Sequence, residues 1–192
     1  GITVTMLTSN FDTIPKKLAL YKKKYYSNSL LRGVIFFTAV VFTAWPFFSS
    51  LEYFGRFNSA VRFSLLLSFS VLVGFTLYKW IILPILQLTR LNKQLSDEEA
   101  AIQIGKFFPQ VSDKLLNALQ LKKLSTQENE LLIASINQKS AELSVIPFTE
   151  AVKLEENKKH LKYIVLPIAL ILVLFQFAPG LLTEGMTRIV KY

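Results

Sequence analysis

The chain has 192 residues, a formal net charge of +9 and no cysteine. The lack of cysteine excludes disulfides, thiolate nucleophiles and thiol-ligated metals. Hydrophobic residues make up 52% of the sequence, and they are concentrated in three runs instead of recurring at core-forming intervals. This distribution predicts membrane-spanning helices rather than the one or two soluble domains usual for this length.

The chain begins with a basic segment, residues 1–29, which we expect on the cytoplasmic side. Residues 1–5 precede the first methionine and carry no weight in the fold prediction. Three consecutive lysines stand beside tyrosines in this segment, and three more lysines lie next to the last apolar run. Lysines so placed are suited to contact anionic lipid headgroups. The candidate headgroup contacts are Lys22, Lys23, Lys24, Lys158, Lys159 and Lys162.

Three apolar runs follow, and each predicts one membrane-spanning helix. Their uncharged centres read "GVIFFTAVVFTAWPFF", "FSLLLSFSVLVGFTLY" and "YIVLPIALILVLFQFA". Each centre is shorter than the roughly 20 residues that cross a bilayer, so flanking aromatic and basic residues complete the span. The spans are predicted at residues 30–54, 60–86 and 161–182. The alternative is three buried helices of a soluble protein, and the lack of polar residues on every face disfavours it.

The distribution of lysine and arginine predicts the orientation of the spans. Six of these residues precede the uncharged centre of the first span and twelve lie within residues 79–162, whereas only Arg56 and Arg62 lie between the centres of the first two spans. By the positive-inside rule, the N-terminus and residues 88–160 face the cytoplasm, and residues 183–192 begin an external region. Because topology accounts for the basic excess and no folded basic face is apparent, nucleic acid is not an expected partner.

The segment between the second and third spans is expected to fold as a cytoplasmic module of four helices. Ser96 and Glu99 match the S-x-x-E capping box that opens a helix. Pro109 ends this helix one or two residues earlier, because proline disfavours the helical conformation of its predecessor. Ser112 or Asp113 can then cap the second helix.

The remaining helices of the module are predicted from further caps and breakers. A second capping box, Ser125–Glu128, opens the third helix, which Pro147 ends. Thr149 can cap the fourth helix, which we expect to continue into the third span as one rod bent at Pro167. The predicted fold is therefore an all-α membrane protein with three transmembrane helices and a four-helix cytoplasmic insertion between the second and third.

Two sets of residues are candidates for packing or docking. Apolar residues at helical spacing in the module predict its core or a docking face, with the core favoured: Phe107, Phe108, Leu115, Leu116 and Leu119. Small residues at four-residue steps in the second span suit close packing of transmembrane helices: Ala60, Ser64, Ser68, Ser70 and Gly74.

The sequence offers little for catalysis or metal binding. Asp97, Glu98 and Glu99 point around a helix rather than to one place, and helix capping explains them better than metal binding. His160 is the only histidine, and we expect it at the membrane edge. No glycine-rich phosphate loop or G-x-S-x-G motif occurs. We therefore expect no catalytic residue, cofactor or metal. The span centres also lack charges, and Gln176 is their most polar deep residue.

Four stretches of the sequence resemble a known family. They are "KKYYSNSLLRGVIFF", "SSLEYFGRFNSAVRF", "DEEAAIQIGKFFPQVSDKLLNALQL" and "TEGMTRIVKY". They are similar to the N-terminal membrane portion of large, uncharacterised inner-membrane proteins of Bacteroidota-type bacteria, a domain of unknown function. The resemblance implies two spans, a cytoplasmic helical insertion, a third span and a long periplasmic part. It implies no activity, and it suggests that the chain is the membrane-proximal portion of a longer protein.

These observations lead to two hypotheses about function. The first is a non-enzymatic anchor and scaffold of a larger cell-envelope complex, which docks other membrane proteins through its spans or its module. The alternative is a transport or lipid-handling accessory subunit, with a groove between the spans near Gln176 and the serines of the second span. The expected partners are other membrane proteins and a bilayer with anionic headgroups.

Overall fold

The computed structural model describes residues 13–89, 94–124 and 130–191, and all regular elements in these ranges are helices. Three helical stretches, Thr13–Gly55, Ser59–Leu88 and Phe148–Phe177, are long and apolar enough to cross a membrane. The expectation of a helical chain with three candidate spans is therefore confirmed by length and composition.

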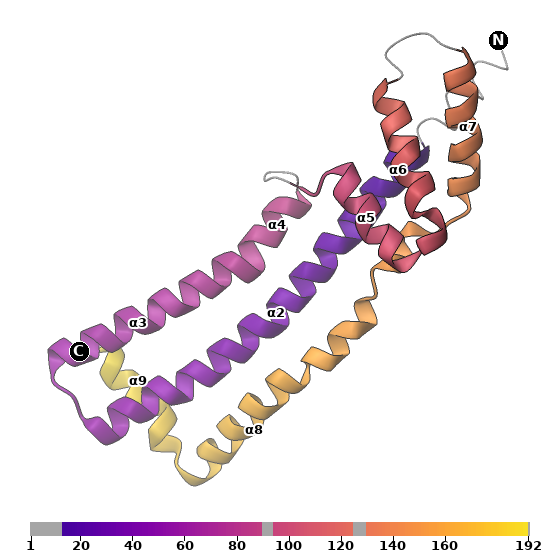
Figure 1. Cartoon of the computed structure of the whole chain (residues 1–192). Helices are drawn as coiled ribbons and strands as arrows, with labels where there is room; N and C mark the ends of the chain where they lie inside the picture. The colour runs from indigo at the N-terminus through magenta and orange to yellow at the C-terminus, as the bar shows by residue number, and fades with distance from the viewer. Residues whose placement is uncertain (1–12, 90–93, 125–129, 192) are drawn as a thin grey trace. The chain divides into compact units, whose positions relative to one another are not determined.

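The chain divides into two compact units (Figure 1). The module unit comprises the described residues of Gly1–Ser27 and Gln87–Lys153, and the span unit comprises those of Asn28–Leu86 and Leu154–Tyr192. Helix α2 (Thr13–Gly55) contributes to both units, because the boundary at Ser27 falls inside it.

In the module unit, α5 (Asp97–Phe107) begins with the predicted capping box. The backbone N–H of Glu99 donates to Ser96 Oγ over 3.1 Å, and the N–H of Ser96 donates to Glu99 Oε2 over 2.8 Å. Phe108 follows as the C-cap, so α5 ends where Pro109 predicts. The start and the end of α5 are thus fixed by short-range sequence signals alone.

Helix α6 (Pro109–Leu124) starts earlier than predicted, because Pro109 is its first residue and neither Ser112 nor Asp113 caps it. Proline suits the first helical position, since its φ is already helical and no intrahelical donor is lost there. The third helix of the module is α7 (Glu130–Ser144). The capping box predicted at residues 125–128 lies outside the described residues.

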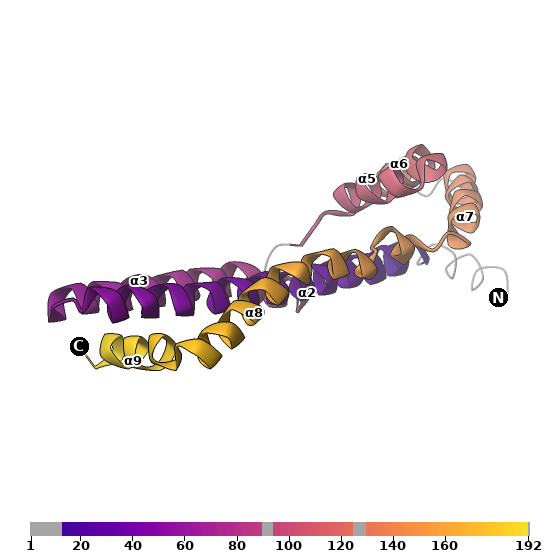
Figure 2. The ribbon, with the colours of Figure 1, turned by 90° about the horizontal axis from the view of Figure 1, so that it is seen from below.

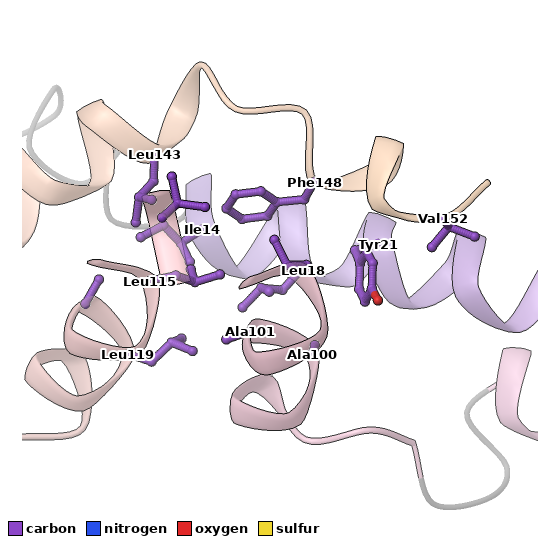
Figure 3. Packing of buried hydrophobic residues seen from close by; sticks show 13 residues of the cluster. Ile14, Leu18, Tyr21, Ala100, Ala101, Leu115, Leu119, Leu143, Phe148 and Val152 are labelled. Atoms are coloured by element: carbon purple, nitrogen blue, oxygen red, sulfur yellow. The ribbon is translucent and has the colours of Figure 1, made fainter. Parts of the chain in front are cut away.

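The module core includes the start of α2, a stretch that the sequence predicts only to be part of a basic N-terminal segment. Figure 3 shows Ile14, Leu18 and Tyr21 of α2 among side chains of α5, α6 and the segment after α7. Their spacing of four and three residues places them on one helix face. Leu18 is 1% exposed, and burying such a side chain stabilises by about 2 kcal/mol. The first helix is therefore also a helix of the module.

The end of α7 is held by a lysine of α2. Lys17 Nζ donates to the carbonyl oxygens of Leu143 (3.1 Å), Ser144 and Ile146 (2.5 Å). Leu143 and Ser144 belong to the last turn of α7, where carbonyls lack an intrahelical donor and the helix dipole favours a cation. Burial lowers the pKa of Lys17 below its ordinary value. The three carbonyl contacts make Lys17 a cap of this helix end.

The predicted fourth helix of the module is wrong as a continuous α-helix. The chain instead forms two 3₁₀ helices, η2 (Phe148–Ala151) and η3 (Leu154–His160), separated at Val152, which is extended with φ −103° and ψ 106°. The cause is tertiary packing, which overrides local propensity. Phe148 and Val152 are buried in the module core, and Lys24 Nζ donates to Thr149 O over 2.8 Å.

The span unit is formed by α2 from Asn28 onward, by η3 and by further helical elements. The latter are α3 (Ser59–Leu77), which continues through the π-helix η1 (Tyr78–Ile82) into α4 (Leu83–Leu88), and then α8 (Lys162–Phe177) and α9 (Pro179–Val190). Figures 1 and 2 show α3 and α8 running alongside the same stretch of α2. Contacts of α3 with α9 and of α8 with α9 place α9 against these spans.

The third span ends earlier than predicted. α8 stops at Phe177 because Ala178 precedes Pro179 and takes the non-helical conformation favoured there, with φ −146°. A single helix over residues 161–182 is therefore wrong at its C-terminal end. Residues 183–190, expected to begin an external region, belong to α9, whose buried face includes Leu182, Gly185 and Ile189.

Tyr21 makes the module unit sensitive to alkaline pH. Its side chain is 2% exposed, and its hydroxyl donates to Gln103 Oε1 over 2.9 Å. Burial, with a smaller contribution from Tyr25, raises the pKa of Tyr21 from 10.0 to about 12. Between these values the unfolded state loses the proton while the folded state keeps it, so the free energy of unfolding falls as pH rises.

We predict that alkaline destabilisation from pH 10 to 12 weakens in Tyr21→Phe, which lacks the titrating group. The phenol contributes about 2 kcal/mol to this loss. Thermal unfolding followed by circular dichroism across this pH range measures it. Tyr78→Phe removes a phenol that is 53% exposed, and this control should keep the wild-type slope. Identical slopes in all three proteins would refute the assignment.

Candidate functional site

Two glycines of the span unit permit close approach of helix backbones. A Cβ at Gly33 of α2 would lie 1.8 Å from the carbonyl oxygen of Trp80, and a Cβ at Gly185 of α9 would lie 2.0 Å from that of Ser49. Such approach is the usual role of small residues between transmembrane helices. Neither position was predicted from the sequence; Gly185 has no small residue four positions away, whereas Gly33 follows Ser29 at that spacing.

Polar side chains hold α9 and α3 to the end of α2. Ser49 Oγ donates to the carbonyls of Leu181 and Leu182, and Trp45 Nε1 donates to Leu182 O over 3.3 Å. One turn further along α2, Glu52 is fully buried, and its Oε1 pairs with Arg62 Nε of α3 at 2.9 Å. Removing one partner of such a pair costs more than the pair itself contributes, so this contact fixes the α2–α3 turn.

A groove of about 760 Å³ runs along α2 between α3 and α8. The α2 side of the groove is a single stripe at three- and four-residue spacing that begins at Phe36 and ends at Phe48. The other walls come from Leu72 and Trp80 on one side and from the first turns of α8 on the other. The remaining lining residues are Ala39, Val40, Thr43, Ala44, Phe47, Lys162, Tyr163, Leu166 and Pro167.

Aromatic rings and one cation gather at one end of this groove. The Phe36 ring lies 5.7 Å from that of Trp80 and 5.0 Å from that of His160, whose ring is stacked on Tyr163 at 6.1 Å. The ammonium of Lys162 lies 5.3 Å from the centre of the Tyr163 ring. Trp, Tyr and Lys are the residues typical of the boundary between hydrocarbon and headgroups. His160 Nδ1 is buried and has no hydrogen-bond partner within the described part of the chain.

The small residues predicted for helix packing all lie on the exposed face of α3: Ala60, Ser64, Ser68, Ser70 and Gly74. At about 100° per residue they share one half of the helix surface. Leu72 and Phe69 lie on the other half, and Phe69 packs on Phe48 of α2 at 5.5 Å. A Cβ at Gly74 would meet no atom within 4 Å. The described helices of this chain therefore leave these small residues uncovered, together with the exposed Leu67 and Val71 on the same half of α3.

The structure places most of the five apolar candidates of the module in its interior. Leu115 and Leu119 belong to the buried core, and Phe108 and Leu116 pack against it while partly buried. Phe107 is 38% exposed, with the ammonium of Lys153 at 5.0 Å from its ring centre. Of this set, Phe107 alone offers an exposed ring to another molecule.

The predicted headgroup lysines divide into two groups. Lys22 pairs with Asp97 at 2.7 Å and Lys24 is bonded to Thr149 O, so both contribute to the module fold. Lys23 lines a cavity of about 620 Å³ in the module unit. The other three predicted headgroup lysines, Lys158, Lys159 and Lys162, are exposed in the span unit, and of these Lys162 lines the groove.

The three consecutive acids at the start of α5 do not converge on one point. Asp97 pairs with Lys22, Glu98 with Lys123, and Glu99 completes the capping box. Among residues 13–89, 94–124 and 130–191, no three His, Asp or Glu side chains are placed to hold a metal ion. The arrangement of these acids is that of helix capping and surface ion pairs.

No protein-family model, curated protein or solved structure matches the chain. The resemblance to the family of inner-membrane proteins therefore rests on the four stretches quoted above.

The two kinds of glycine environment lead to a matched prediction. Gly33→Ala forces α2 away from the Trp80 backbone, and we expect a loss of about 2 kcal/mol, as for other overpacked sites. Gly74→Ala adds a methyl group to open space, so its expected change lies between zero and a gain of about 1 kcal/mol. Thermal unfolding of the purified chain in detergent measures both. Equal destabilisation of the two variants would contradict the packing described for Gly33.

Proposed function

We propose that the chain is a non-enzymatic membrane anchor and scaffold subunit of a larger cell-envelope complex. The observation that carries this proposal is the set of exposed small residues on α3, which no described helix of the chain covers. In the same unit, Gly33 and Gly185 are each covered by a neighbouring backbone, whereas Gly74 is open. Small residues in spans promote close helix contacts, and the described helices of the chain leave this face to another helix.

The hydroxyl groups of this face support the same proposal. Ser64 Oγ donates to Ala60 O over 3.1 Å, so its hydrogen bond is satisfied locally while the side chain stays small and exposed. Exposed Leu67 and Val71 lie on the same half of α3 as Ser64, Ser68 and Gly74. A partner helix packed on the small residues would also cover these apolar side chains.

The module unit supplies a folded platform for the same role. Its core joins helices from both sides of the second span's sequence, α2 before it and α5 and α6 after it. Exposed apolar side chains remain on its helices, among them Ile102 at 48% and Leu131 at 81%. We place this unit in the cytoplasm and the turn between α2 and α3 in the periplasm of a bacterial inner membrane, following the positive-inside rule.

This topology predicts which sites a membrane-impermeant maleimide reaches. The chain has no cysteine of its own, so single-cysteine variants report one site each. In intact cells we expect labelling of Ser59→Cys, at the start of α3, and no labelling of Gln110→Cys on α6 until the membrane is permeabilised. The opposite pattern would reverse the proposed orientation.

Photo-cross-linking tests the scaffold itself. A benzophenone maleimide attached at Ser68→Cys should cross-link one membrane protein stoichiometrically in native membranes, because position 68 lies on the partner-facing half of α3. The matched control is Ala169→Cys, an exposed small residue of α8, which should give only lipid adducts. Gly74→Leu should reduce the position-68 adduct at least tenfold, since bulk there separates the helices, while Ala169→Leu should not. Identical adducts from positions 68 and 169 would rule out docking on α3.

The groove along α2 favours a second candidate function, that of a lipid-handling accessory subunit. Its apolar lining, with Lys162 at one end, favours an anionic lipid as the ligand.

A further inference from the structure

The wall of the groove offers almost no hydrogen bonds to a ligand. The side chains along α2 are aromatic or aliphatic except Thr43, whose hydroxyl already donates to Ala39 O over 2.7 Å. A polar ligand would lose its hydration there without compensation. The middle of the groove therefore suits a hydrocarbon chain.

The length of the groove matches one leaflet of a bilayer. The α2 stripe from Phe36 to Phe48 covers twelve helical steps, or about 18 Å at 1.5 Å per residue. Half of a hydrocarbon core measures about 15 Å. An acyl chain matches both this length and the apolar lining of the groove.

Positive charge gathers where the groove meets the aromatic rings. Gly33 touches Trp80, and Phe36 touches His160, so the residues next to them in sequence share this end of the span unit. The cations here are Arg32, Lys79, Lys158, Lys159 and Lys162, and the acids on the same elements are Glu155 and Glu156. This end therefore has an excess of three positive charges, which favours a phosphate-bearing headgroup.

From these features we infer that the groove binds one acyl chain of an anionic phospholipid, with the lipid phosphate at Lys162. Lys162 is exposed and lines the groove beside Tyr163, so its ammonium can reach a headgroup while the chain lies against Phe36 and Val40. The binding site is separate from the docking face of α3 and does not depend on the scaffold function.

Trp80 provides a reporter inside the site. The chain has two tryptophans, so Trp45→Phe leaves Trp80, which lines the groove, as the only fluorophore of this kind. The full chain is reconstituted in phosphatidylcholine vesicles with a minor fraction of phosphatidylglycerol. Either the phosphatidylglycerol or an equal amount of the phosphatidylcholine is brominated, and bromine quenches tryptophan fluorescence only at short range.

We expect brominated phosphatidylglycerol to associate with the Trp80 site about fivefold more strongly than brominated phosphatidylcholine. Lys162→Gln should remove this preference, because one lysine near a membrane surface accounts for about a fivefold change in association. Lys106→Gln removes an exposed charge of α5 in the module unit, and this control should keep the preference.

A second pair of variants tests the acyl-chain part of the site. Thr43→Phe fills the groove and should lower quenching by both lipids to the level of randomly distributed bromine. Thr38→Phe is the matched control, since Thr38 is also bonded to a carbonyl of its own helix (2.8 Å to Val34 O) but does not line the groove. Circular dichroism checks folding, and Val40→Phe replaces Thr43→Phe if the latter does not fold.

Equal association of the two brominated lipids with the wild-type site would overturn the proposal, as would undiminished quenching in folded Thr43→Phe. A benzophenone at Thr43→Cys that captures a protein stoichiometrically in native membranes would show that a partner helix, not a lipid, occupies the groove. These outcomes are independent of cross-linking at position 68, so the lipid site and the scaffold can fail separately.

Discussion

The structure depends on the continuity of α2, because one helix supplies side chains to both compact units. Leu18 and Tyr21 complete the module core, and Gly33, Ser49 and Glu52 lie at the closest contacts of the span unit. Both sets lie on a single helix of 43 residues. A break in this helix would remove three side chains from the core of the module and the central wall from the groove.

Short-range signals made part of the fold predictable from the sequence. Ser96 and Glu99 satisfy orphan N–H groups within their own turn, and Pro109 acts on its immediate neighbours, so these positions needed no tertiary information. The segment after Pro147 behaved differently. Its 3₁₀ turns follow from the burial of Phe148 and Val152 and from the bond of Lys24 to Thr149 O, all of which are long-range contacts. The same explanation applies to the basic N-terminal segment. Its lysines were predicted to contact lipid headgroups, but Lys22 pairs with Asp97 and Lys24 bonds to Thr149 O, both far away in sequence.

The candidate site was predictable in type but not in position. The sequence indicated that small residues would pack and that cations would lie at the membrane edge. It could not show that Gly33 and Gly185 are used within the chain while Gly74 is open, because the difference lies in which helix reaches each glycine. The groove could not be predicted from the sequence either, because its residues come from three spans far apart in sequence and only the α2 residues recur with a helical period.

The division of α3 into two faces determines how the proposed functions relate. Leu72 and Trp80 face the groove, whereas Ser64, Ser68 and Gly74 lie on the exposed half. A partner helix on the exposed half therefore leaves the groove accessible to lipid, and a bound lipid leaves the small-residue face uncovered. Coupling between the two ligands would require a change in the α2–α3 packing that both faces share. Gly33 opposes such a change through its backbone contact, and the ion pair of buried Glu52 with Arg62 opposes it because separation would leave Glu52 as a buried, unpaired charge. Lipid and partner are thus expected to bind independently, each adding stability to the same rigid α2–α3 pair.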